Sequence, residues 1–173
     1  IFNDSGFKTQ LEQHVTDDGR DRSDIVVEDW PSRAHAAPGE PAALVDLHLD
    51  VAVTYAAGAT ALAAGADKRR GARGRQRCKE KQKHYAPLVE APNIFKGAIV
   101  ETFGFIDHEL RGALRTAAES HTNQSCQDLG LSSNARRILI AATVQTFYER
   151  LSVAVQKGTA NALRRATFTA RDA

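Results

Sequence analysis

The 173-residue chain contains four residues of the kinds found in sites that hydrolyse phosphodiester bonds: Asp24, Asp50, Lys81 and Tyr85. Asp24 precedes a short β-branched run, and Asp50 lies within a longer segment of alternating polarity. Lys81 and Tyr85 are four residues apart, a spacing that puts both on one helix face. Two carboxylates near strand ends can hold Mg²⁺, which prefers oxygen ligands. A nearby lysine can orient a water or stabilise a phosphorane-like transition state, so such a set is able to hydrolyse phosphodiesters with a metal. The alternative from spacing alone is that the acids are turn or surface residues, Lys81 a solvated charge and Tyr85 a residue at the edge of the core.

Other acids and one histidine compete for places in this set. Asp46 lies on the same side of the alternating segment as Asp50, four residues earlier, and is the alternative acid. His48 shares that side and could lie at the edge of the site or be an ordinary polar strand residue. Glu101 could supply a further acid from a third strand.

Several other kinds of site are not indicated by the sequence. The glycines have no phosphate-loop spacing, and no Ser-His-Asp elbow is present, which argues against nucleotide hydrolysis and serine hydrolase chemistry. The histidines form no HxxxH or HExxH pattern, so zinc is not expected. They are His14, His35, His48, His84, His108 and His121.

The two cysteines, Cys78 and Cys126, are too few for a disulfide framework and lack paired zinc-site spacing. We predict that both are free thiols with Cα atoms more than ~7 Å apart, beyond bridging range. Free thiols indicate a reducing compartment, so we expect an intracellular protein, nuclear or cytoplasmic.

Charge is distributed unevenly along the chain. Residues 1–50 hold 11 acidic and 4 basic residues, whereas the remainder holds 19 basic and 10 acidic ones. Residues 68–83 carry nine basic residues in sixteen, which predicts contacts to a nucleic-acid backbone; the alternative is a solvated charged stretch. The candidate DNA-binding residues are Arg69, Arg70, Arg73, Arg75, Arg77, Lys79 and Lys83.

The composition, 42% hydrophobic and 25% charged, is that of a globular domain and excludes collagen, mucin-like stalks and a wholly disordered chain. No continuous apolar run approaches the ~20 residues of a membrane span, so no transmembrane segment is expected. The chain opens Ile-Phe-Asn-Asp without a signal-peptide pattern. We therefore expect a fragment or processed piece of a longer protein.

The elements that must position these residues can be read from periodicity and capping. The patterns predict strands at 25–27, 43–55 and 98–103, a helix at 76–89, and a loop at 28–42 that contains Pro31 and Pro38. Segment 1–22 is expected to be irregular, with a helical turn or two at 8–14. Asp107 can cap one helix and Ser132 or Ser133 another, which should end at Gly158. Strands mixed with covering helices indicate an α/β domain with a small mixed β-sheet.

Three short motifs occur in a characteristic order. Residues 22–27 read Arg-Ser-Asp-Ile-Val-Val, residues 49–54 read Leu-Asp-Val-Ala-Val-Thr, and residues 79–85 read Lys-Glu-Lys-Gln-Lys-His-Tyr. Together they resemble the restriction-like endonuclease domain of non-LTR retrotransposon polyproteins, a variant of the PD-(D/E)xK nucleases. The segments 100–104 and 150–160 also resemble related retroelement reading frames. The resemblance spans roughly residues 20–165.

The resemblance implies a restriction-endonuclease-like fold with additional C-terminal helices, and a role for each motif residue. Asp24 and Asp50 would be metal-binding acids, Lys81 the catalytic lysine and Tyr85 its companion. The lysine has moved from the strand to the helix, consistent with Ala52 two residues after Asp50. The implied cofactor is Mg²⁺. The implied partners are DNA, element RNA and the reverse transcriptase portion of the same polyprotein, with no membrane.

The resemblance also suggests boundaries: a polar N-terminal segment 1–21, a nuclease core 22–121 and a C-terminal helical extension 122–173. Ser23 stands where the family has proline, and the gap between the two acids is longer than in the family. A non-catalytic nucleic-acid-binding remnant of a mobile element is therefore the alternative function. A third possibility is a structural or interaction module built on the C-terminal helices.

Overall fold

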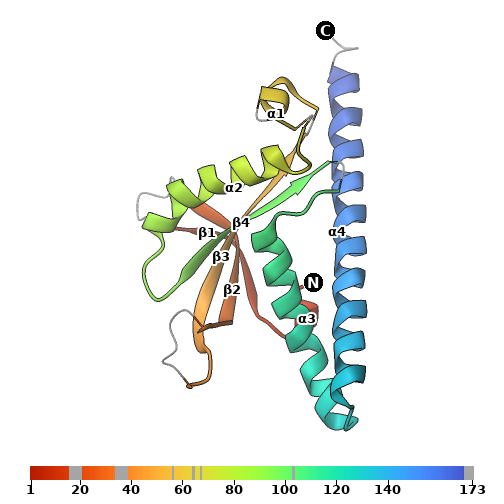
Figure 1. Cartoon of the computed structure of the whole chain (residues 1–173). Helices are drawn as coiled ribbons and strands as arrows, with labels where there is room; N and C mark the ends of the chain where they lie inside the picture. Colours follow the sequence, from red (N-terminus) through yellow and green to blue (C-terminus); the bar gives the residue numbers. More distant parts are fainter. Residues whose placement is uncertain are drawn as a thin grey trace.

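A four-stranded mixed β-sheet with helices on both faces forms the centre of the molecule (Figure 1). The computed structural model describes residues 1–15, 21–33, 39–55, 57–63, 65–66, 68–102 and 104–169. The strands lie in chain order, with antiparallel neighbours except for the last pair, which is parallel. They are β1 (Thr9–His14), β2 (Arg22–Ser32), β3 (Ala43–Thr54) and β4 (Ile94–Glu101). The predicted α/β class, with a small mixed sheet flanked by helices, is confirmed.

The connection from β3 to β4 includes the helix that covers one face of the sheet. This crossover contains α1 (Ala59–Ala63), α2 (Ala72–Tyr85) and the short 3₁₀ helix η3 (Ala86–Leu88). Parallel neighbours require such a crossover. Of the three, α2 packs against β4 and β3 and so covers this face (Figure 1).

The other sheet face carries the main apolar core. It is covered by α3 (His108–Asp128), against which α4 (Ser133–Thr169) packs. Alternate residues of β3, such as Leu47 and Leu49, are fully buried there. They pack with residues of the other elements: Val27, Ala98, Val100, Ala113, Leu114, Ala117 and Phe147.

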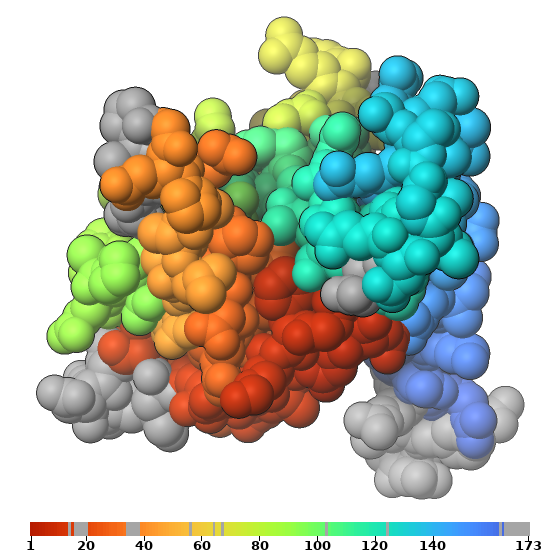
Figure 2. All heavy atoms as spheres, turned by 90° about the horizontal axis from the view of Figure 1, so that it is seen from below, coloured from red at the N-terminus to blue at the C-terminus, as the bar shows by residue number. Residues whose placement is uncertain are grey.

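The N-terminal residues close the lower edge of this core. The rings of Phe2 and Phe7 lie 6.0 Å and 5.0 Å from the buried Trp30 ring. The 3₁₀ helix η1 (Asn3–Ser5) contacts α3, and Asp4 forms a 2.7 Å ion pair with Arg150 of α4. In the view from below, the red N-terminal residues accordingly lie beside the teal and blue helices (Figure 2).

Two predictions for the N-terminal part are wrong. Residues 9–14 form β1 rather than a helical turn, because they pair with β2. Residues 28–32 belong to β2 rather than to a loop. The β2–β3 register shifts between Val27 and Trp30, where Asp29 adopts a φ of 53°. This irregularity carries the strand through Pro31, a residue that sheets tolerate at edges and bulges.

The basic helix begins earlier than its glycines indicated. We expected it at 76–89, but α2 runs from Ala72 to Tyr85. Glu101 of β4 accepts a 2.8 Å hydrogen bond from the backbone N–H of Gly74, in the first turn of the helix. A first-turn N–H has no partner within its own helix, so this tertiary carboxylate compensates for the poor helix propensity of glycine.

The C-terminal helices confirm the caps but not the end. Asp107 is buried and its carboxylate accepts from the N–H of Glu109, which caps α3 as predicted. Ser132 Oγ accepts from the N–H of Ala135 at the start of α4. The predicted end at Gly158 is wrong, since α4 continues to Thr169. A single exposed glycine costs only about 1 kcal/mol, which a long helix tolerates.

The remaining bounds differ less. The strand expected at 98–103 is β4, which begins at Ile94 and ends at Glu101. Pro38 of the expected loop and Phe103 of the expected strand lie outside the described residues. The expected domain boundary at 121/122 falls within α3, and the segment 1–21 contributes β1 to the sheet.

Within the described residues, one helix is long and apolar enough to cross a membrane by length and composition. It is Ser133–Ala162 of α4, which contains an 18-residue window with a mean hydropathy of 1.2. Glu149 and Arg150 interrupt the apolar residues of this helix, so it contains no continuous apolar run of the length that a membrane span needs. Only 6% of that window is buried in the structure, although Phe147 of α4 packs into the core.

Both cysteines are free, as predicted. Cys78 lies on the inner face of α2, and Cys126 lies near the end of α3 on the opposite side of the sheet. Burial raises the pKa of the Cys78 thiol to about 12, and nearby Asp107 adds to the effect. This thiol is therefore protonated at neutral pH and is a poor nucleophile.

The first prediction compares two glycines. Gly71 precedes α2 with a φ of +76°, and a Cβ there would lie 2.3 Å from the Phe105 ring, so Gly71→Ala should cost about 2–3 kcal/mol of unfolding free energy. Gly158 in α4 has open space around it, so Gly158→Ala should add about 0.5–1 kcal/mol. Urea unfolding of the two variants measures both changes. Equal stability of the two variants would contradict this packing of α2.

Candidate active site

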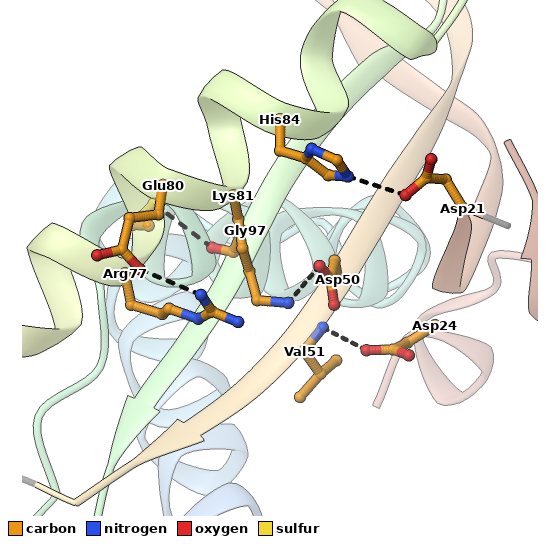
Figure 3. Close-up of polar contacts among 10 residues, drawn as sticks. Asp21, Asp24, Asp50, Val51, Arg77, Glu80, Lys81, His84 and Gly97 are labelled. Atoms are coloured by element: carbon orange, nitrogen blue, oxygen red, sulfur yellow. Dashed lines mark hydrogen bonds and ion pairs between the residues drawn. The ribbon is translucent and has the colours of Figure 1, made fainter. Parts of the chain in front are cut away.

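The register of β2 and β3 brings the two predicted acids together. Ile25 pairs with Leu49, so the next residues, Asp24 and Asp50, lie opposite each other. Opposed residues of antiparallel strands point to the same sheet face. The regular pairing ends here, and the Asp24 carboxylate instead accepts a 2.6 Å hydrogen bond from the N–H of Val51 (Figure 3). Asp24 thus occupies the edge where β2 and β3 separate.

Asp50 is buried beside a lysine. Its side chain is 7% exposed, and its Oδ2 accepts a hydrogen bond from Lys81 Nζ (Figure 3). Burial raises the pKa of the Asp50 carboxyl and the Asp24 carboxylate raises it further, whereas Lys81 lowers it. The net direction is upward. Asp50 and Lys81 are therefore poorly solvated, and the partly exposed Asp24 lies beside them.

Lys81 reaches Asp50 because α2 lies unusually close to the sheet. Asp50 pairs across to Gly97 of β4, and a Cβ at Gly97 would lie 3.3 Å from Cys78 Sγ. The missing side chain lets α2 approach β4. The inner face of α2 is formed by Gly74, Cys78, Lys81 and Tyr85, which recur at helical spacing. The helix face that packs against the sheet thus also places Lys81 beside Asp50.

Tyr85 lies one turn beyond Lys81. Its ring stacks on Phe95 of β4 with centroids 5.2 Å apart, and Lys81 Nζ lies 5.8 Å from the tyrosine centroid. Burial raises the pKa of the Tyr85 hydroxyl, and the negative charges of Asp50 and nearby acids add to the effect. The hydroxyl is therefore protonated at neutral pH and is able to donate a hydrogen bond.

Two residues at the edge of the site were not predicted. His84 Nε2 lies 2.8 Å from an Asp21 carboxylate oxygen, which links α2 to the residue just before β2 (Figure 3). Asp21 also contributes to the raised pKa of Tyr85. No motif identified the pair, because it joins residues 63 positions apart. The position of His84 next to Tyr85 was the one available signal.

The competing acids lie elsewhere. Asp46 is four residues from Asp50, about 13 Å along an extended strand, and its N–H donates to Asn93. Glu101 is buried and accepts from Gly74, so it holds the start of α2. The structure therefore brings neither to the Asp24–Asp50 pair.

His48 lies next to the site and has a structural partner. Its Nδ1 is 3.0 Å from Oγ of the fully buried Ser23. Burial lowers the pKa of His48, against the opposing charge of Asp46, so the ring is neutral at neutral pH. The Ser23–His48 hydrogen bond thus links β2 to β3 directly before Asp24.

The predicted DNA-binding residues separate into paired and exposed groups. Arg73 and Arg77 each lie 3.1 Å from a Glu80 oxygen, and Arg77 is close to the site (Figure 3). The Arg75 guanidinium lies 5.5 Å from the centre of the Phe105 ring. Exposed residues on or before α2 complete the group: Arg69, Arg70, Lys79 and Lys83. Apart from Glu80, the exposed charged residues of this helix are arginines and lysines.

The acids fit a magnesium ion. Mg²⁺ commonly binds through one or two carboxylates, together with waters and substrate phosphates. Asp24 and Asp50 provide two such carboxylates. Burial is the main cause of the raised pKa of Asp50 and repulsion from Asp24 adds to it, and a divalent cation would relieve that repulsion. Among the described residues no group of three or more His, Cys, Asp or Glu side chains could hold a metal. The donor set thus suits Mg²⁺ and not a fully protein-ligated ion.

Comparison with protein-family models, curated proteins and solved structures finds no match to this chain. The geometry of the side chains therefore defines the candidate site. Side chains from β2, β3 and α2 meet at one end of one sheet face, and all four residues predicted to be catalytic are among them.

The second prediction concerns the buried pair. Lys81→Met leaves Asp50 buried without its cation and should lower the unfolding free energy by about 3 kcal/mol. Adding Asp50→Leu removes the isolated acid and should restore most of that loss. Exposed Lys79 on the same helix is the control, since Lys79→Met should change stability by less than about 0.5 kcal/mol. Equal losses for the two lysine variants would show that Lys81 has no buried partner.

Proposed function

We propose that the chain is a Mg²⁺-dependent endonuclease domain with a restriction-endonuclease-like fold, which nicks DNA for retroelement integration. The observation that carries this proposal is the meeting of Asp24, Asp50, Lys81 and Tyr85 on one sheet face. The small mixed sheet with helices on both faces supports it as well. A chance motif match would not require three separate elements to place these residues together.

Each residue can be given a role in phosphodiester hydrolysis. The two carboxylates would hold Mg²⁺, which when bound supplies a Lewis acid for a phosphodiester oxygen. Lys81 orients Asp50 by its hydrogen bond, and its ammonium lies where it can also stabilise negative charge that develops on the phosphate. Tyr85 keeps its proton and can donate a hydrogen bond at the same place.

DNA would approach over α2. The exposed Lys79 and Lys83 lie on its outer face, and Arg77 flanks the acids. Phosphate contacts of this kind position a duplex without reading its sequence. Element RNA and the reverse transcriptase portion of the same polyprotein belong to the proposal as further partners, in an intracellular setting.

The third prediction tests catalysis. Asp50→Asn and Asp24→Asn should each reduce Mg²⁺-dependent nicking of supercoiled plasmid by about 100-fold or more, because each removes a metal ligand. Asp46→Asn is the matched control, since Asp46 lies on the same strand away from the pair and should retain activity. Nicking that survives in Asp50→Asn but is lost in Asp46→Asn would move the site to Asp46.

The fourth prediction separates a nuclease from a non-catalytic nucleic-acid-binding remnant. Replacing Lys79 and Lys83 with Gln should weaken duplex binding for all sequences and flatten the salt dependence by up to ~0.9 per lost phosphate contact. Asp50→Asn should keep duplex binding in EDTA. Wild-type protein that binds DNA with this salt dependence but never nicks it with Mg²⁺ would be the remnant.

A further inference from the structure

A second basic site lies on the opposite side of the sheet from the acids. α3 and α4 form an open cavity of about 720 Å³, within the size range of ligand pockets. Arg111 and Arg115 of α3 line it, one helical turn apart, and Arg137 of α4 also lines it. The order of the layers separates this cavity from the α2 face, so it is not part of the nuclease site.

The charges in this cavity are only partly balanced. Arg115 forms a 3.0 Å ion pair with Glu119, and His108, also in the lining, lies near acids at its own helix terminus. Across the part of the chain that the structure describes, Arg111 and Arg137 have no carboxylate partner. Two exposed guanidinium groups beside one cavity favour an anionic occupant.

The rest of the lining is apolar. Ile140, Val144 and Tyr148 of α4 contribute to it, and each is partly buried against the core. Ile138 lines the same cavity and remains 63% exposed. A purely ionic ligand such as free phosphate would leave this apolar surface in water. The lining therefore suits an occupant with both anionic and apolar groups.

We propose that this cavity binds single-stranded nucleic acid. Phosphates would contact Arg111 and Arg137, and a base would lie against Tyr148 and the apolar wall. Arginine forks match phosphate oxygens, and bases stack on aromatic rings without regard to sequence. Because a single strand exposes the faces of its bases, a base can reach Tyr148, whereas the bases of a duplex stay stacked on one another. The proposal does not depend on the nuclease assignment.

The test uses neighbouring arginines of α4. Arg137 lines the cavity, whereas Arg136 hydrogen-bonds Asn123 and lines a separate hollow. Fluorescence anisotropy with a labelled ten-nucleotide oligothymidylate, in EDTA, compares the full chain with Arg137→Gln and Arg136→Gln. Arg137→Gln should weaken binding roughly tenfold and reduce the salt slope by about 0.7, while Arg136→Gln stays near wild type.

A second variant tests stacking. Tyr148→Leu keeps apolar volume but removes the ring, and should weaken binding about fivefold or more. Plasmid nicking by Arg137→Gln should equal that of wild type, so failure of either proposal is distinguishable. Equal oligonucleotide affinities for Arg136→Gln and Arg137→Gln would overturn the inference. Tighter, Arg137-dependent binding of a labelled oligoglutamate peptide would also overturn it, by assigning the cavity to an acidic protein.

Discussion

The packing of α2 against the β-sheet depends on the buried ion pair between Lys81 and Asp50. An acid and a lysine taken out of water must meet with good geometry, or each destabilises the fold by several kcal/mol. That requirement fixes the distance between α2 and the sheet. Gly97 supplies the space, and Cys78 packs into it. Asp24 of β2 then lies beside the pair, so the structural constraint also brings together the residues of the proposed catalytic site.

Several parts of this arrangement could be predicted from the sequence because local signals agree with tertiary packing. The alternation of residues 43–55 predicts β3 to within a residue, since one face of that strand is buried throughout its central part. Asp107 predicts the start of α3 by a capping bond that needs only its neighbours. The placement of Lys81 and Tyr85 on one face follows from helical spacing, although their approach to Asp50 was implied only by the family resemblance.

The rest required contacts that no local pattern records. β1 exists because β2 offers it an edge, and residues 8–14 carry no strong strand signal of their own. The early start of α2 depends on Glu101, 27 residues from Gly74, and on the Phe105 ring that fills the space beside Gly71. The Asp21–His84 link is likewise long-range. In each case a tertiary partner outweighs a weak or contrary propensity.

The effect of Mg²⁺ on thermal stability tests most directly whether Asp24 and Asp50 form a metal site. A ligand that binds only the folded state stabilises it in proportion to RT ln(1 + [L]/Kd), independently of catalysis. We expect a saturable rise of the wild-type melting temperature with Mg²⁺. The Asp24→Asn and Asp50→Asn variants should both lose this rise, and Asp46→Asn should keep it. An equal rise in all four proteins, or none in the wild type, would contradict a metal site at the Asp24–Asp50 pair.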